Sequence, residues 1–240
     1  MRIALTTDQA KLAADIQAAA SQRADLILAP RGLTSWQDVA AQAELSDGPF
    51  AAEIANLAKQ NSIAILASFV ERCTSGTFKA ALMSDHAGHM ICCYRQTHLP
   101  EDANAAHLDH GQWLTQAMLN GVMTGLLLGE DLLHPELARA LAVSGTSLLL
   151  VLEDGRLLAD TLRSLAIARA LENHLPVVIA SASLTGMADP NGRFHDGNLI
   201  ETAAPISAGN HRRGTRLARR RPQLYHAITM VEDAENKPPL

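Results

Sequence analysis

The sequence is short of aromatic residues: two Trp, two Tyr and four Phe make up 3% of its 240 residues. The hydrophobic share is nevertheless 48%, so Leu, Ala, Val and Ile must supply most of the core. A chain of this length can bury a large core in one domain. We therefore expect a single domain over residues 1–230, followed by a tail at 231–240 that is acidic and contains Pro-Pro.

Long apolar runs and a basic excess are also missing. No run approaches the ~20 apolar residues of a membrane-spanning helix, and the N-terminal MRIALTTDQ lacks the plan of a signal peptide. The formal net charge of −5 argues against general nucleic-acid binding. The three cysteines, Cys73, Cys92 and Cys93, cannot all pair within the chain, which favours a reducing compartment. We expect a cytoplasmic protein that does not enter a membrane.

The most informative stretch is Thr124–Gly145. Its apolar run Leu126–Leu128 stops abruptly at Gly129, and apolar residues then recur at helical spacing between Pro135 and a closing glycine. Proline in the first helical turn and glycine after the last are typical helix boundaries. The pattern predicts a strand, a sharp elbow and a helix, a layout that presents the elbow residue to a ligand. Here the elbow residue is Gly129, which has no side chain.

Strands and helices alternate at both ends of the chain, with hairpin-like strands between them. We expect strands at 2–6, 25–29, 62–71, 77–84, 89–96, 122–128, 146–152 and 176–181, and helices at 9–24, 50–60, after the elbow and at 156–173. The polar stretch 100–120 is expected to be irregular and to lie over the site. This order predicts an α/β protein in which two mixed sheets pack face to face with helices outside, an α-β-β-α sandwich.

Five segments, taken in order, resemble the carbon–nitrogen hydrolase (nitrilase/amidase) superfamily. They are Ala29-Pro30-Arg31, Tyr94-Arg95-Gln96-Thr97-His98-Leu99, Leu128-Gly129-Glu130-Asp131 with Pro135-Glu136 and Arg139, Arg169-Ala170-Leu171-Glu172-Asn173-His174-Leu175-Pro176-Val177, and Arg221-Pro222-Gln223-Leu224-Tyr225. The family counterparts are Phe-Pro-Glu, Tyr-Arg-Lys-x-His-Leu, Cys-x-Asp with Pro-Glu and Arg, Arg-Ala-x-Glu-Asn-x-x-Pro-Val, and Arg-x-Pro-x-Leu-Tyr. The resemblance covers nearly the whole chain and implies the same α-β-β-α fold.

The resemblance implies chemistry that the residues here do not supply. In the family a glutamate deprotonates the nucleophilic cysteine and a lysine stabilises the developing charge of a covalent intermediate. The matching positions are Arg31, Gln96 and Gly129, and a second family glutamate falls near Asn104. We therefore expect a pseudoenzyme that binds a small ligand or completes an assembly with an active relative. Gly129→Cys alone is not expected to restore activity, because base and lysine are also missing.

The changed positions make the expected pocket positive. A buried Arg31 needs an anion, which is either internal, at Glu130 or Asp131, or an external carboxylate or phosphate held by the guanidinium. Gln96 and backbone N–H groups of the elbow would complete such a cradle. The predicted ligand-binding residues are Arg31, Gln96, Asn104, Gly129, Glu130 and Asp131. No cofactor or metal is expected.

Three alternatives stay open. The chain is a carbon–nitrogen hydrolase acting through unrecognised residues, or it binds nucleic acid through the arginine run 211–221, or its paired histidines hold a metal. We regard the run as a solvated or packing face, and the pairs His86/His89 and His107/His110 as loop residues. The resemblance implies a homodimer or a heteromer with a relative, formed by the helix after the elbow and the C-terminal segment.

Overall fold

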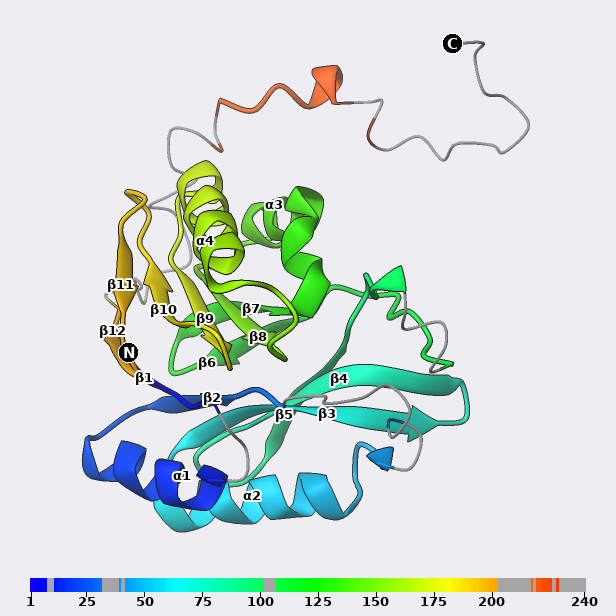
Figure 1. Cartoon of the computed structure of the whole chain (residues 1–240), viewed down its shortest axis with the longest axis vertical. Coiled ribbons are helices and arrows are strands. Elements are labelled where there is room, and N and C mark those ends of the chain that lie inside the picture. Colours follow the sequence, from blue (N-terminus) through cyan, green and yellow to red (C-terminus); the bar gives the residue numbers. More distant parts are fainter. Residues whose placement is uncertain are drawn as a thin grey trace.

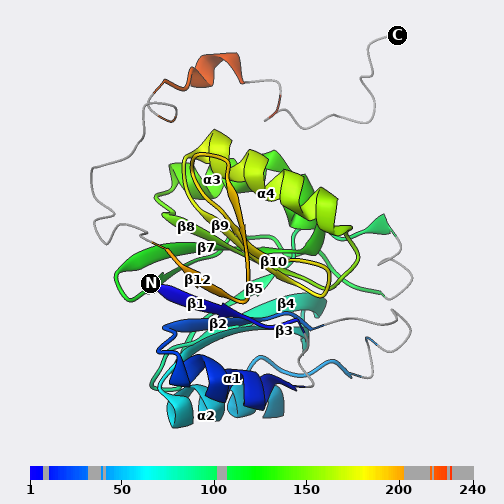
Figure 2. The same cartoon turned by 60° about the vertical axis from the view of Figure 1, so that its left-hand side comes forward.

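A computed structural model describes residues 1–7, 11–31, 39, 42–101, 107–202, 217, 219–225 and 228. Within these residues it contains two six-stranded sheets that face each other, with two helices on each outer side (Figure 1). Figure 2 shows the four layers from a second direction. The predicted α-β-β-α sandwich is confirmed.

The first sheet has the order β12-β1-β2-β3-β4-β5. Its strands are β1 (Arg2–Leu5), β2 (Leu26–Ala29), β3 (Ala64–Cys73), β4 (Gly76–Ser84), β5 (Met90–Arg95) and β12 (Leu199–Glu201). Strands β1, β2 and β3 are parallel and are connected by α1 (Leu12–Ser21) and α2 (Pro49–Asn61), whereas β4, β5 and β12 pair antiparallel. The ends of β2 and β5 are where the resemblance places its first two site positions.

The second sheet repeats this plan in the order β11-β10-β9-β8-β7-β6. Its strands are β6 (Gln116–Leu119), β7 (Val122–Leu128), β8 (Leu148–Glu153), β9 (Val177–Ser181), β10 (Thr185–Ala188) and β11 (Phe194–Asp196). Parallel strands β7, β8 and β9 are connected by α3 (Pro135–Val143) and α4 (Ala159–Asn173). The turn of 3₁₀ helix Gly129–Leu133 separates β7 from α3, and the turn Pro222–Leu224 lies near the C-terminal end.

Aliphatic side chains fill the three interfaces between the four layers. Leu28, Leu66, Leu128 and Leu150 belong to the core between the sheets. The outer faces pack against the helices, as with Ile16 of α1 on the first sheet. Helix spacing explains the contacts, because residues three and four apart share one face of a helix. The sequence does not predict four short strands at or next to the sheet edges. Strand β6 lies inside the stretch expected to be irregular, and β10, β11 and β12 follow the last predicted strand.

Candidate functional site

The elbow between β7 and α3 depends on a backbone conformation that suits glycine. Gly129 has a φ of +47°, a left-handed conformation that costs an L residue with a Cβ roughly 1–2 kcal/mol. An ideal Cβ on Gly129 would lie 3.2 Å from Gln96 Nε2 and 3.2 Å from Lys79 Nζ. Position 129 therefore points at two polar side chains that come from the other sheet.

Asp131 holds the elbow turn in place. Its carboxylate is fully buried and accepts five hydrogen bonds, from the backbone N–H groups of Leu128, Thr97 and His98 and from the hydroxyls of Thr97 and Tyr94. The bonds to Tyr94, Thr97 and His98 tie the elbow to the end of β5. Burial, followed by the nearby Asp131 charge, raises the pKa of Tyr94 far above its usual range, so the phenol remains a donor. This carboxylate joins the two sheets.

Arg169 of α4 stabilises the other end of the elbow turn. Arg169 as a whole is 6% exposed. Its guanidinium donates to the carbonyl oxygens of Leu132 and Leu133 and lies 3.2 Å from the Glu172 carboxylate. The last carbonyls of a helical turn have no partner within the turn, and a cation there satisfies them. The Arg-Ala-x-Glu-Asn segment thus anchors the elbow and lies outside the polar cluster around Gly129.

Lys79 is the unexpected group at the site. It lies on β4 directly across the ladder from Gln96, whose backbone N–H donates to the Lys79 carbonyl at 2.8 Å. Side chains opposite each other on neighbouring strands point to the same face, and here that face is the one between the sheets, shared with Tyr94 of the core. The Lys79 side chain is 5% exposed. The amine is therefore buried beside Gly129.

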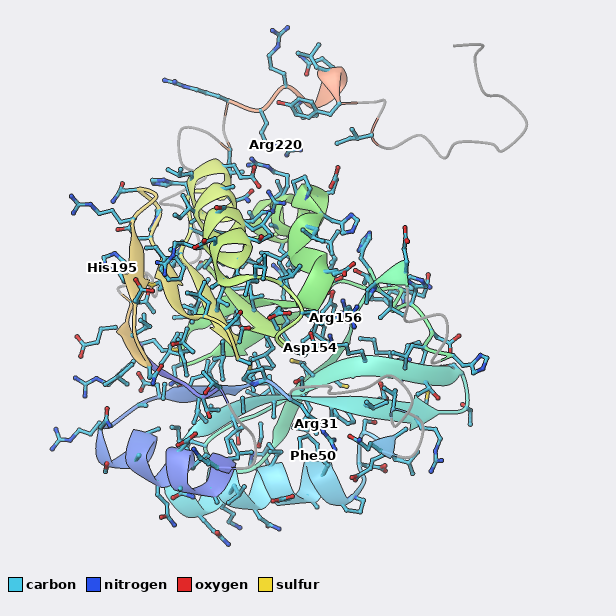
Figure 3. The ribbon with its side chains drawn as sticks, in the orientation of Figure 1. Arg31, Phe50, Asp154, Arg156, His195 and Arg220 are labelled. Carbon is cyan, nitrogen blue, oxygen red and sulfur yellow. The ribbon has the colours of Figure 1, made fainter. Side chains whose placement is uncertain are left out.

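Asp154 is the partner of this buried lysine. Its Oδ2 lies 2.6 Å from Lys79 Nζ, and its side chain is 2% exposed. Asp154 follows β8, the strand parallel to β7, so the elbow and this carboxylate leave the second sheet at the same edge. The loop is shaped by Glu153, which accepts from the backbone N–H groups of Gly155, Arg156 and Leu157. Figure 3 shows Asp154 where this loop approaches the first sheet.

Two acceptor atoms at the site have no hydrogen-bond partner within the described part of the chain. They are Gln96 Oε1 and Asp154 Oδ1, both buried. Gln96 Nε2 donates to the His98 carbonyl at 2.7 Å, which fixes the orientation of the amide and leaves Oε1 as the free acceptor. Buried polar atoms without partners are rare in folded proteins and call for a ligand or water. We define Lys79, Gln96, Gly129 and Asp154 as the elbow cluster.

Comparison with known proteins decides the family. The sequence profile of the carbon–nitrogen hydrolase family matches residues 5–202. A Pseudomonas protegens protein described as the hydrolase in the pqqF 5′ region is 31% identical over 231 residues, which cover 86% of this chain and 81% of that protein. The chain belongs to the carbon–nitrogen hydrolase family.

Solved structures share the fold. A mutant of the Nesterenkonia AN1 amidase from the nitrilase superfamily, with a cysteine replaced by alanine, superposes with a TM-score of 0.81 at 21% identity, covering 95% of this chain and 97% of the amidase. A double mutant of the same amidase in complex with acrylamide gives a TM-score of 0.78 at 22% identity, with the same coverage. At this identity the likeness is one of fold.

The structure divides the residues that the sequence singled out. It brings Gln96 and Gly129 together. The five hydrogen bonds that Asp131 accepts come from Leu128 and from Tyr94, Thr97 and His98 at the end of β5, and its assignment to the ligand-binding residues stays a prediction. Arg31 follows β2 by two residues (Figure 3). It is half-buried and donates its backbone N–H to Ser68 Oγ at 2.6 Å. Glu130 is half-buried next to Gly129. Asn104 lies outside the described residues.

The cysteines take no part in the elbow cluster. Cys92 packs against the core between the sheets and Cys93 against the core under α1 and α2, as alternation along a strand requires. Burial raises the pKa of Cys92 to about 11 and that of Cys93 to about 12. The described residues include no cluster of three or more His, Cys, Asp or Glu side chains placed to bind a metal.

Two further expectations concern the ends of the chain and its helices. Of the arginine run, 211–216 and 218 lie outside the described residues, as does the tail at 231–240; Arg220 lies 5.8 Å from the centre of the Tyr225 ring. None of the described helices is long and apolar enough to cross a membrane.

The sequence motifs do not identify Lys79 and Asp154, because neither residue lies in a segment that resembles a family motif. A signal was present for the lysine: it interrupts the apolar strand 78–83, and a lysine in a buried strand requires a partner. The aspartate carried a weaker signal, since Glu153-Asp154-Gly155 ends the apolar run 148–152 as Gly129 ends its own. The sequence offers no means of pairing residues 75 positions apart.

Proposed function

We propose that this carbon–nitrogen hydrolase family member binds a small primary carboxamide at the elbow cluster without forming a covalent intermediate. The observation that supports the proposal is the pair of buried acceptors, Gln96 Oε1 and Asp154 Oδ1, beside the amine of Lys79. An ammonium has three N–H donors, and Lys79 uses one of them on Asp154. The cluster thus presents one donor group and two acceptors.

A primary carboxamide has the complementary pattern. Its carbonyl oxygen accepts a hydrogen bond, and its NH₂ group donates two. The carbonyl would accept from Lys79, and the NH₂ group would donate to Gln96 Oε1 and Asp154 Oδ1. A carboxylate is less suitable, because its oxygens only accept and would face the Asp154 charge. This replaces the anionic ligand expected from Arg31 as the first choice of probe.

The missing side chain at Gly129 is the reason for proposing binding without a covalent step. Nucleophilic catalysis needs a side chain that attacks the carbonyl carbon, and position 129, which faces Lys79 and Gln96, has none. Cys92 and Cys93 are half-buried on β5, and burial raises their pKa values to about 11 and 12. Neither thiol is placed to replace the missing group.

Thermal unfolding with small amides tests the proposal. Mutants of the Nesterenkonia amidase have been solved in complex with acrylamide and with butyramide, which makes butyramide and its matched acid, butyrate, suitable probes. We expect butyramide to raise the melting temperature more than butyrate does. The control is the double variant Lys79→Met/Asp154→Leu, which removes both charges together and should lose the response. Equal responses of both proteins, or no response of the native chain, would refute amide binding at this cluster.

A second candidate, direct hydrolysis of the amide by water, is favoured by the unpartnered Asp154 Oδ1. Asp154 would take a proton from water as the hydroxide attacks the carbonyl carbon, while Lys79 stabilises the oxyanion. The C–N bond then breaks, and the proton leaves with the amine as ammonia. Ammonia release should survive replacement of all three cysteines and disappear in Asp154→Asn. Release that survives Asp154→Asn would contradict this route.

We also propose that the chain forms a homodimer or a heteromer with a relative through the surface at α3. Two exposed apolar residues flank this surface: Leu133 ends the 3₁₀ turn before α3 and Val143 is the last residue of α3, with exposures of 39% and 46%. A stable pair would bury about 1,600 Å² or more. Sedimentation should show a dimer at micromolar concentration, and replacing Val143 with Glu should weaken it. A monomer without a co-purifying partner would contradict the proposal.

A further inference from the structure

The elbow cluster contains both charged groups that a nucleophile at position 129 would need, although neither lies at the sequence position that the family uses. Lys79 lies on β4, directly opposite Gln96 at the end of the edge strand β5. The two side chains therefore point to the same face of the sheet. Asp154 comes from the end of β8 rather than from the end of β2. We propose that Lys79 and Asp154 form a relocated charge-stabilising pair, so that this site lacks only a nucleophile.

The distances around Gly129 support this assignment. An ideal Cβ at position 129 would be 3.2 Å from Lys79 Nζ, and the same nitrogen is 2.6 Å from Asp154 Oδ2. A lysine head lies at the end of a flexible chain and can shift by tenths of an ångström to admit a side chain. Gln96, at the family's lysine position, contacts the same point through its amide. Position 129 is thus surrounded by one cation and one neutral amide.

The chemistry of Gly129→Cys follows from this arrangement. The introduced thiol would pass its proton to Asp154, and the resulting thiolate would lie beside the Lys79 ammonium. Attack on an amide forms the C–S bond, and the oxyanion is stabilised by Lys79; the C–N bond breaks as Asp154 returns the proton to the leaving ammonia. Water then attacks the thioester carbon while Asp154 accepts its proton. The C–S bond breaks, the carboxylic acid leaves, and Asp154 returns the proton to the thiolate. Every proton is accounted for by residues of this chain.

The experiment measures alkylation of the introduced thiol by iodoacetamide between pH 5 and pH 9. It uses Gly129→Cys in a Cys73→Ser background. All three native thiols are half-buried, but hydrogen bonds with Ser75 lower the pKa of Cys73, whereas burial raises the pKa values of Cys92 and Cys93. At pH 7 we expect alkylation about tenfold faster than in the same protein carrying Lys79→Met/Asp154→Leu. Butyramide turnover to ammonia is the second readout. The sequence motifs alone argue against turnover by Gly129→Cys, whereas the Lys79–Asp154 pair would supply the missing base and lysine. Turnover should be absent from the matched variant Gly129→Ser/Cys73→Ser if a thiolate is required.

Each outcome of the experiment is decisive. A thiol whose pH profile is the same with and without the Lys79–Asp154 pair would overturn the inference. Failure of both Gly129→Cys and Gly129→Ala to fold would also overturn it, because the inference requires that the space beside Lys79 admit a side chain. The inference does not rest on the proposed ligand. If alkylation of the introduced thiol is fast and depends on Lys79 and Asp154, but butyramide does not raise the melting temperature of the native chain, only the proposal of amide binding is refuted.

Discussion

Asp131 and Asp154 are both buried carboxylates at the same edge of the second sheet, yet their surroundings differ. Asp131 accepts five hydrogen bonds from the elbow and from the end of β5. Asp154 has one ion pair, with Lys79, and one oxygen without a partner among the described residues. The first carboxylate fixes the elbow, and the second retains capacity to bind.

This difference separates what the fold requires from what a ligand can use. A polar group that is fully satisfied inside the protein stabilises one conformation, whereas a buried group that is half satisfied carries a desolvation cost. The family motif that contains Asp131 is therefore explained by the fold alone. The proposed function depends on the elbow cluster, whose charged members lie outside the motifs. The following predictions test this division.

Asp131→Ala should have the largest effect. It leaves buried donors without an acceptor, among them the Tyr94 hydroxyl and the Leu128 N–H. A buried donor without a partner costs about 1–3 kcal/mol, so we expect a loss of about 4 kcal/mol or more in the free energy of unfolding, measured by urea titration. Tyr94→Phe serves as control and should lose about 1–2 kcal/mol. Equal losses would show that the remaining contacts of Asp131 contribute little.

Lys79→Met should rank second, and its effect should be reversible by a second substitution. The single change leaves Asp154 buried without its counterion, which costs about 3–5 kcal/mol. Lys79→Met/Asp154→Leu removes both charges and should recover most of that loss, because apolar replacement of a buried ion pair is often neutral. Chemical denaturation of the two variants checks this. A double variant as unstable as the single one would mean that the pair stabilises the fold as Asp131 does.

The sequence predicted the fold more completely than the site. Buried strands such as β8 carry continuous apolar runs, and α4 has a helical repeat, so local patterns indicate them. The three-residue strands β11 and β12 are half exposed and carry no such pattern. Gln96 and Gly129 were found through motifs, but Lys79 joins the site by a cross-strand register and Asp154 by packing between sheets. Both depend on tertiary structure, which no local pattern encodes.

Gln96→Met should have a smaller effect on stability than either charged residue. The change removes the hydrogen bond to the His98 carbonyl, worth about 1 kcal/mol, but it also removes the buried acceptor Oε1 that has no partner. These contributions oppose each other, so the free energy of unfolding should change by less than about 1 kcal/mol. Butyramide binding should weaken nonetheless. A large loss of stability with unchanged binding would place Gln96 in the structural group with Asp131.

The smallest effect is a pH dependence on the Asp131 side of the site, at His134. Its ring stacks on that of His98, with centroids 3.8 Å apart. Burial, and then the nearby His98, lowers the pKa of His134, although Asp131 and Glu136 act in the opposite direction. With its pKa lower in the folded state, His134 binds more protons when unfolded, so its contribution to stability is present above about pH 6.5 and declines as the pH falls.

His134→Asn keeps a side chain suited to the start of α3. Urea unfolding at pH 7.5 and pH 5.5 should therefore show a smaller loss for the variant than for the native chain. A variant that loses as much would mean that protonation of His134 is not coupled to folding, and that the acid sensitivity of the elbow comes from other groups.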